Sequence, residues 1–267
     1  MDPHRLRLVL FAVIGLGICA VIGYRRSRER ELPPGDPTAM AAPVEPSGRC
    51  LELLEPKGPV ACPYSGEPSP SPSPDFAQRF EAGNPCVAVG RLNVTSGRLV
   101  ATDPLVNIER KPFSRSIPPG KYPVFLTIDK AEQAIAFALL KLGEGRPIRW
   151  EKAEPGPGYF VDAGVGCFAD AATGDLIRAK QARSPEDWLF AAMKPVGPGE
   201  GVNVCVDPAS GANLIAFHSG IGDGTYPSYF GFDAAGAAVA LVTDFEIVDL
   251  GAGRHPWLEG LRPSARP

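Results

Sequence analysis

Short stretches in which apolar residues occupy every second position recur along the chain from residue 92 onward. In one of them Val202, Val204 and Val206 are separated by Asn203 and Cys205. A period of two puts alternate side chains on one face of an extended chain, so each stretch predicts a β-strand with one buried face. The clearest strands are predicted at residues 92–94, 98–100, 122–128, 135–139, 202–206, 214–218, 229–233 and 239–248.

Turn signals between these stretches predict how the strands connect. A Ser-Gly pair at 96–97 predicts a compact hairpin between the first two strands, and residues 234–236 predict a closing hairpin between the last two. Short helices are predicted at 75–81 and 184–190, and residues 131–142 fit a helix as well as a strand. About ten strands with two or three short helices indicate a mainly β domain, a sandwich or an open barrel, with an α+β domain as the alternative.

An uninterrupted apolar run, LVLFAVIGLGICAVIG, occupies residues 8–23. As a helix it would be about 24 Å long, slightly less than a bilayer core, and the flanking Arg7 and Arg25 can extend to the headgroups. The run therefore predicts a single N-terminal membrane helix. A cleaved signal peptide and a buried helix are the alternatives, but Tyr24 and a run of arginines stand where signal peptidase needs small residues.

The composition changes after this run. Twelve of the 45 residues from 31 to 75 are Pro, which favours an extended polyproline II conformation over a packed core. Four parts are therefore predicted along the chain. They are a membrane anchor with basic flanks at 1–30, a Pro-rich linker at 31–75, a globular domain at 76–250 and a loose tail at 251–267.

Charge is distributed unevenly along the chain. The net charge is −3, but residues 1–30 hold six Arg against Asp2 and Glu29, a balance of +4 that leaves −7 for the remainder. An acidic body lacks the basic face that nucleic acid requires, so no nucleic-acid partner is expected. Four Arg follow the apolar run and two precede it, which by the positive-inside rule places the domain in the cytoplasm. The cysteines and the long linker favour the opposite side.

Six cysteines stand at positions 19, 50, 62, 86, 167 and 205. No two of them have the CxxC spacing of a zinc site or a redox motif. In an oxidising compartment, Cys50 and Cys62 could close a short loop by a disulfide bond. Cys167 and His218 permit a thiol–imidazole pair, although a buried cysteine is commonly an inert small apolar residue.

Two acidic loops that contain glycine are the strongest candidates for a functional site. In the first, Asp162 and Asp170 bracket Gly164 and Gly166, and the glycines allow a sharp turn that would bring the two carboxylates together. Two neighbouring carboxylates bind a hard cation or divide the roles of acid and base. The alternative is that each aspartate caps its own turn by accepting backbone N–H groups.

The second loop contains Gly222, Asp223 and Gly224 and leads to Tyr226. Successive backbone N–H groups in such a loop can hold an anion, and a purely structural turn is the alternative. The loop is not a P-loop, because no Gly-Lys-Ser/Thr follows it. It also precedes a strand signal where the dinucleotide fingerprint needs a helix, so no nucleotide cofactor is indicated.

Four segments of the predicted domain carry distinctive strings, among them PPGKYPV, DAGVGCFAD and GDGTYPSYFGFD. Together they resemble a bacterial family catalogued as domain of unknown function 4241. The likeness covers roughly residues 80–250, and the segments keep the order and spacing of that family. It implies no known activity, substrate or cofactor. The matching segments are residues 90–106, 111–128, 161–170 and 219–248.

The leading hypothesis is a membrane-tethered, non-enzymatic module that binds a protein or a small ligand, with an immunity-type role as one version. The alternative is a metal-assisted hydrolase in which Asp162, Asp170 and Asp223 share a divalent cation beside Tyr226. A surface scaffold is the third hypothesis. The predicted cleft consists of residues from both loops, namely Asp162, Gly164, Gly166, Asp170, Gly222, Asp223, Gly224 and Tyr226.

Overall fold

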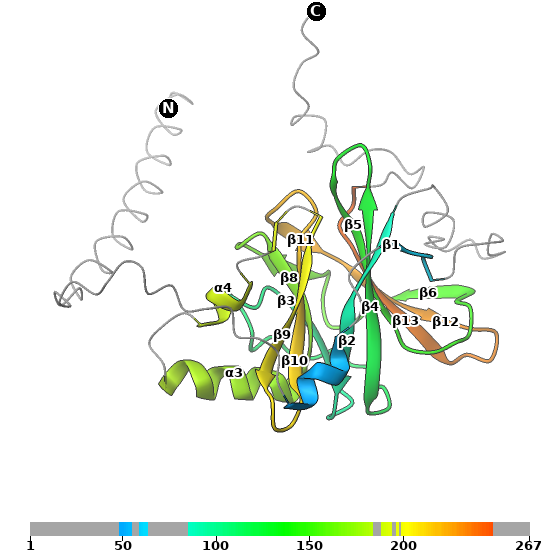
Figure 1. Cartoon of the computed structure of the whole chain (residues 1–267). Helices are drawn as coiled ribbons and strands as arrows, with labels where there is room; N and C mark the ends of the chain where they lie inside the picture. The colour runs from blue at the N-terminus through cyan, green and yellow to red at the C-terminus, as the bar shows by residue number, and fades with distance from the viewer. Residues whose placement is uncertain are drawn as a thin grey trace, which may run out of the picture. The chain divides into compact units, whose positions relative to one another are not determined.

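The computed structural model describes residues 48–54, 59–63, 85–183, 188–193, 196–197 and 199–247. Within these ranges the chain forms thirteen strands and three short helices, and the strand pairs are antiparallel (Figure 1). The predicted mainly β class is therefore confirmed, and the described sheets do not close into a barrel. The α+β alternative is wrong because strands carry nearly all of the core.

The strands form two main sheets and one two-stranded ribbon. The seven-stranded sheet has the order β1 (Pro59–Val60), β2 (Cys86–Val94), β4 (Gly120–Asp129), β5 (Ala134–Lys141), β13 (Ala238–Asp244), β12 (Ser228–Phe232) and β6 (Arg149–Lys152). The four-stranded sheet has the order β3 (Leu99–Thr102), β8 (Val165–Asp170), β10 (Ala212–His218) and β9 (Gly201–Asp207). The ribbon pairs β11 (Gly224–Tyr226) with β7 (Tyr159–Val161).

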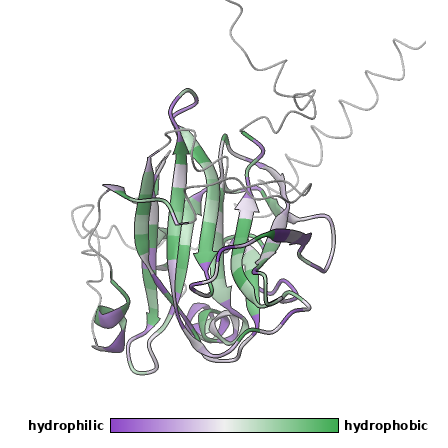
Figure 2. Ribbon diagram, turned by 90° about the vertical axis from the view of Figure 1, so that its right-hand side faces the viewer, coloured by the Kyte–Doolittle hydropathy of each residue, from purple (hydrophilic) through white to green (hydrophobic). Residues whose placement is uncertain are grey.

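The main core lies between the two sheets. Leu92 and Leu126 come from the seven-stranded sheet, and Phe168 and Phe217 come from the four-stranded sheet, where their rings meet edge to face at 5.1 Å between centroids. Figure 2 shows hydrophobic residues running along the strands, while the connecting loops are mostly hydrophilic. In the central strands, alternate residues thus bury one face against the other sheet, as the sequence pattern predicts.

The outer faces of both sheets also bury apolar residues. Helices α3 (Ala171–Arg183) and α4 (Trp188–Met193) lie on the outer side of the four-stranded sheet, with Ile177 and Leu189 fully buried (Figure 1). On the outer face of the seven-stranded sheet, Phe137 and Leu139 form a further buried cluster with residues of β13. Strand β5 is therefore buried on both faces, which explains why its continuous apolar letters fit a helix equally well.

The predicted hairpin at 96–97 is wrong, although both strands exist. β2 pairs with β1 and β4, whereas β3 pairs with β8 of the other sheet, so the turn carries the chain from one sheet to the other. The carboxylate of Asp170 holds this corner by accepting hydrogen bonds from the amides of Thr95 and Ser96. The closing hairpin is confirmed, because β12 pairs with β13.

Helix α3 was not predicted from the sequence. Its first turn is capped by Asp170, whose Oδ1 accepts the amide of Ala172 at 3.2 Å, and an Asp before a helical stretch is a recognised N-cap signal. The helix predicted around Trp188 is present as α4. The helix predicted at 75–81 lies outside the described residues.

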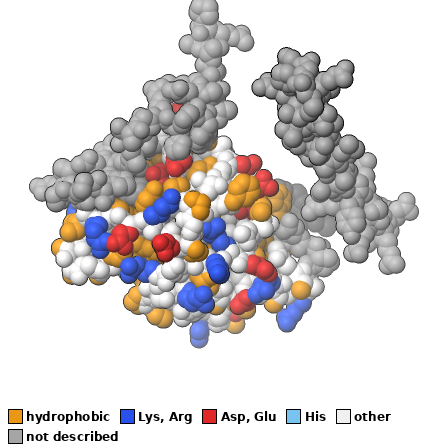
Figure 3. Space-filling view, turned by 180° about the vertical axis from the view of Figure 1, so that it is seen from behind, with side chains coloured by type: hydrophobic (Ala, Val, Ile, Leu, Met, Phe, Trp, Pro, Cys, Tyr) orange, Lys and Arg blue, Asp and Glu red, His pale blue; other side chains and the backbone are white. Residues whose placement is uncertain are grey.

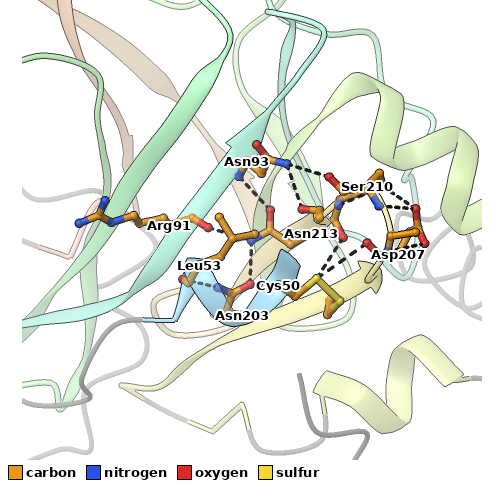
Figure 4. The surroundings of a disulfide bond; sticks show 12 residues. Cys50, Leu53, Arg91, Asn93, Asn203, Asp207, Ser210 and Asn213 are labelled. Carbon is orange, nitrogen blue, oxygen red and sulfur yellow. Dashed lines mark hydrogen bonds between the residues drawn. A yellow bond between two sulfur atoms is a disulfide. The ribbon is translucent and has the colours of Figure 1, made fainter. Parts of the chain in front are cut away.

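The N-terminal part of the described chain is fastened to the fold by a disulfide bond. Cys50, in the 3₁₀ helix η1 (Gly48–Leu53), is bonded to Cys205 of β9 (Figure 4). The carbonyl of Leu53 accepts a hydrogen bond from Asn203 Nδ2 at 2.9 Å. The predicted disulfide bond between Cys50 and Cys62 is therefore wrong. Residues 48–53, which were assigned to the linker, pack against the domain. The disulfide bond and the hydrogen bond from Asn203 hold η1 against β9, although the two elements are about 150 residues apart in the sequence.

A buried asparagine beside the disulfide connects the two sheets. Asn213 of β10 is fully buried, and Figure 4 shows its amide between β2 and β9. Its Nδ2 donates to the carbonyl of Arg91 and to Asn203 Oδ1, both at 2.8 Å, and its Oδ1 accepts the amide of Asn93 at 2.9 Å. Because every polar atom of the amide is used, the network fixes where η1, β2 and β9 meet.

Within the described ranges, no helix is both long enough and apolar enough to cross a bilayer. The predicted membrane helix at 8–23 and the predicted tail at 251–267 lie outside those ranges.

Candidate functional site

The two glycine-containing loops lie side by side. β7 and β11 pair with Val161 opposite Gly224, so the loop that follows β7 meets the loop that precedes β11. The amide of Gly164 donates to Asp223 Oδ1 at 3.1 Å, and the amide of Ser219 donates to the carbonyl of Gly164 at 3.0 Å. The structure therefore brings residues 162–164 and 219–226 into one site.

The outward face of this ribbon carries one large apolar side chain and two carboxylates. Phe160 lies opposite Thr225, and both side chains are exposed, Phe160 to 55% of its surface. Asp162 and Asp223 follow one position beyond the last registered pair, and both are exposed. Since side chains alternate between faces, these four residues share the outer face, while Tyr159 and Val161 point inward and are buried.

A residue missed in the sequence analysis holds the first loop. Asp103, which follows β3, is fully buried. Its Oδ2 accepts the amides of Asp162 and Ala163 at 3.0 and 2.8 Å, and its Oδ1 accepts those of Leu105 and Val106 at 2.9 and 3.3 Å. Four backbone N–H groups thus converge on one carboxylate, and hydrogen bonds to such a group are stronger than those between neutral partners. In the sequence, the Asp103-Pro104 pair is typical of a turn, and nothing near it in the sequence points to the contact with the distant loop.

Tyr226 closes the second loop from inside. Its hydroxyl donates to the carbonyl of Gly222 at 2.8 Å and also lies 3.3 Å from the carbonyl of Ser219. Burial, with smaller contributions from the charges of Asp223 and Glu246, raises the pKa of Tyr226 to about 12. At neutral pH the phenol therefore stays protonated and serves as a hydrogen-bond donor to the loop.

The four glycines of the site have two different roles. Gly164 and Gly222 have φ angles of 67° and 126°, which residues other than glycine rarely adopt. Gly166 and Gly224 do not need unusual angles. A Cβ on Gly166 would lie 2.5 Å from the Tyr159 hydroxyl, so this glycine is required by a close approach rather than by a turn.

Asp170 does not take part in this site. It ends β8, a strand about 17 Å long that separates it from the 162–164 loop. Its Oδ2 accepts the Ser96 amide at 2.7 Å and the Thr95 hydroxyl at 2.8 Å, in addition to capping α3. It lines a separate cleft of about 310 Å³ beside Arg98 and Arg110. The prediction that Asp162 and Asp170 approach each other is wrong, because only Gly164 forms the turn, while Gly166 already lies within β8, which carries the chain away from Asp162.

Acidification provides a test of the corner that Asp170 holds. Burial alone would raise the pKa of Asp170, but hydrogen bonds from Ser96 and Thr95 outweigh it and hold the pKa below the ordinary value of 3.8. A carboxyl group with a lowered folded pKa stabilises the fold above its unfolded pKa, and this contribution is lost as the pH falls through the folded value.

Asp170→Asn is therefore expected to lower the free energy of unfolding by about 1–3 kcal/mol at neutral pH, with a smaller difference from wild type below about pH 4. Urea unfolding of both proteins across this range measures the difference. A difference that stays constant from neutral to acidic pH would contradict the role given to the ionised carboxylate.

The described residues contain no group of three or more His, Cys, Asp and Glu side chains arranged to hold a metal ion. Asp223 binds the backbone of the neighbouring loop, and Asp170 lies at the other end of β8. The three carboxylates of the hydrolase alternative therefore do not share one space.

The thiol–imidazole pair is also not supported. Cys167 is fully buried in β8, and burial raises the pKa of its thiol, which is the opposite of what a nucleophilic cysteine requires. The ring of His218 lies with Nδ1 3.1 Å from the carbonyl of Gly220.

Charge is mixed on the face of the molecule opposite to the view of Figure 1. Figure 3 shows acidic, basic and hydrophobic side chains interspersed over the part of this face that the structure describes.

Comparison with known families gives one match. A family model described as "Protein of unknown function (DUF4241)" matches residues 92–243, which is more than half of the chain. The match contains both loops of the candidate site, Asp103 and Cys205, while Cys50 precedes it. No curated protein and no solved structure matches the chain.

Proposed function

The chain belongs to the DUF4241 family, for which no activity is known, and from its site geometry we propose that it is a membrane-tethered module that binds a protein partner. The proposed contact surface is the outer face of the β7–β11 ribbon. It presents Phe160 as an apolar anchor and the carboxylates of Asp162 and Asp223 to a basic residue of the partner. Binding itself would be the function, without a chemical step.

The observation that carries this proposal is the exposure of Phe160 beside two carboxylates on a restrained surface. Phe160 exposes 55% of its side chain, whereas Tyr159 and Val161 on the same strand are buried. A large exposed aromatic is a frequent anchor of protein interfaces. Like charges at facing positions of a strand pair destabilise it in isolation, and a basic partner would neutralise Asp162 and Asp223.

The polar groups around this surface support binding rather than hydrolysis. Asp103 is saturated by four backbone amides, and the Tyr226 hydroxyl donates to its own loop. Both side chains therefore serve to hold the loops in place. A pre-organised loop pair loses little conformational entropy when a partner binds.

The disulfide bond supports a location on the oxidising side of the membrane. Cys50–Cys205 joins residues that are 155 positions apart, and such structural disulfides persist mainly outside the reducing cytosol. On this proposal residues 8–23 form the anchor. The disulfide bond is then stronger evidence for the orientation than the excess of two arginines after that run, which favours the cytoplasmic side. The disulfide thus favours the outward orientation that the cysteines and linker suggested.

Photo-crosslinking tests the proposed contact surface. The full chain is produced in its own cells with p-benzoylphenylalanine in place of Phe160, or in place of Phe190 as a matched control, since both side chains are 55% exposed. The expected result is a covalent adduct with one protein from position 160 and none from position 190. Asp162→Lys in the same protein should reduce the yield from position 160 about fivefold or more through charge repulsion.

Equal adducts from positions 160 and 190 would indicate random collisions and contradict the proposal. The same holds if position 160 gives no adduct, or if the yield is unaffected by Asp162→Lys. Asp162→Asn separates the loss of one negative charge from its reversal.

A further inference from the structure

Two further cysteines lie next to each other at the edge of the seven-stranded sheet. β1 pairs with β2 so that Val60 faces Cys86 and Pro59 faces Val87. Cys62 stands two residues beyond Val60 and packs, partly buried, against the apolar cluster on the outer face of this sheet. The two side chains are neighbours: Cys86 Sγ lies 3.9 Å from Thr127 Oγ1, and Cys62 shares hydrogen bonds with both Cys86 and Thr127.

We propose that Cys62 and Cys86 are a redox-active pair that closes to a second disulfide bond, with Cys62 as the thiol that reacts first. The proposal concerns a covalent site that is independent of the contact surface around Phe160. It requires an oxidant of the disulfide class, such as oxidised glutathione or an oxidised thiol oxidoreductase. An oxidising compartment would supply this oxidant in the cell.

The surroundings of the two thiols differ in the way that such a reaction needs. Cys62 is partly exposed, whereas only 2% of Cys86 is accessible to solvent. The hydrogen bond from Cys86 lowers the pKa of Cys62, and the same bond, together with burial, raises the pKa of Cys86. An incoming disulfide therefore meets Cys62 first, while Cys86 is protected until its neighbour has reacted.

The reaction balances in two exchange steps. The Cys62 thiolate attacks one sulfur of the oxidant, so a Cys62–oxidant disulfide forms, the oxidant's own disulfide breaks and one thiolate leaves. Cys86 then loses its proton to solvent and attacks Cys62 Sγ, which forms the Cys62–Cys86 bond and releases the second thiolate. Two cysteine thiols are oxidised, and one oxidant disulfide is reduced to two thiols.

The second bond would complete the attachment of the N-terminal segment. Cys50 joins this segment to β9 of the four-stranded sheet, and Cys62 would join it to β2 of the seven-stranded sheet. The segment between them would then link both sheets covalently from outside the core. Of the cysteines in the described residues, Cys167 would stay a thiol, since it is fully buried.

The test uses the purified full chain, reduced and then equilibrated with oxidised glutathione. Peptide mapping without reduction should find Cys62 linked to Cys86 in the wild-type protein and in the matched control Cys167→Ser. In Cys86→Ser, glutathione should stay attached to Cys62. In Cys62→Ser, Cys86 should carry about tenfold less glutathione than Cys62 carries in Cys86→Ser, because Cys86 is buried.

Two results would overturn the proposal. One is a wild-type protein in which both thiols can still be alkylated after Cys50–Cys205 has closed. The other is equal glutathione on Cys86 in Cys62→Ser and on Cys62 in Cys86→Ser. If a serine variant does not fold, the wild-type map still decides whether the bond forms. Failure of the crosslink at position 160 would leave this result unaffected, so the two proposals are tested separately.

Discussion

Replacing Cys50 and Cys205 together by alanine is expected to lower the free energy of unfolding by about 3–5 kcal/mol. The bond joins residues 155 positions apart, so it restricts the unfolded chain by closing a very long loop. It also holds η1 in the position where Asn203 binds the carbonyl of Leu53. For a domain of this size, the corresponding fall in the melting temperature is about 10 °C.

Urea unfolding of the oxidised wild type and the double variant measures this loss. Wild-type protein treated with a reductant is the control, because it breaks the bond without changing the sequence, and its unfolding midpoint should move in the same direction. An unchanged midpoint in the double variant would contradict a stabilising role for the bond.

Asp103→Asn is expected to cost about 3–4 kcal/mol, although the side chain keeps its size. The buried carboxylate accepts four backbone amides, and an asparagine would turn an NH₂ group toward two of them. Those donors would be left unsatisfied, and the charge that strengthens the other two bonds would be lost. The 162–164 loop should therefore loosen even where the protein still folds.

Equilibrium unfolding measures the loss, and amide hydrogen exchange at Asp162 and Ala163 reports the loop directly. Asp162→Asn is the matched control, because this exposed carboxylate should change stability by no more than about 0.5 kcal/mol. If the two variants were equally stable, or if exchange at the loop stayed slow in Asp103→Asn, the proposed support for the site would be wrong.

Local patterns in the sequence predicted those strands whose burial alternates or whose turns are short. The mainly β class and the hairpin of β12 with β13 follow from such local signals. The turn at 96–97 looked local too, but the carboxylate of Asp170 redirects it into the other sheet. A contact made by a residue more than seventy positions away overrides a hairpin signal and cannot be predicted from adjacent letters.

The candidate site was predictable in the same uneven way. Glycines at 164 and 222 marked real turns with positive φ, and the structure places their loops together. For Asp170 the sequence analysis left two possibilities, an approach to Asp162 or a cap on its own turn. The structure supports the cap, because Asp170 Oδ1 accepts the amide of Ala172 at the start of α3. The contribution of Asp103 depends on a loop about sixty residues away, so the sequence showed only a turn. The pairing of Cys50 with Cys205 is equally non-local.

The proposed location of the domain rests on the bond between Cys50 and Cys205 being present in the cell. Its most direct test is thiol trapping, in which acid-quenched cells are alkylated and the full chain is isolated and peptide-mapped without reduction. The expected result is a peptide pair joined through Cys50 and Cys205, with neither residue alkylated. Recovery of both residues as alkylated thiols from cells, while the purified protein forms the bond in oxidised glutathione, would place the domain on the reducing side.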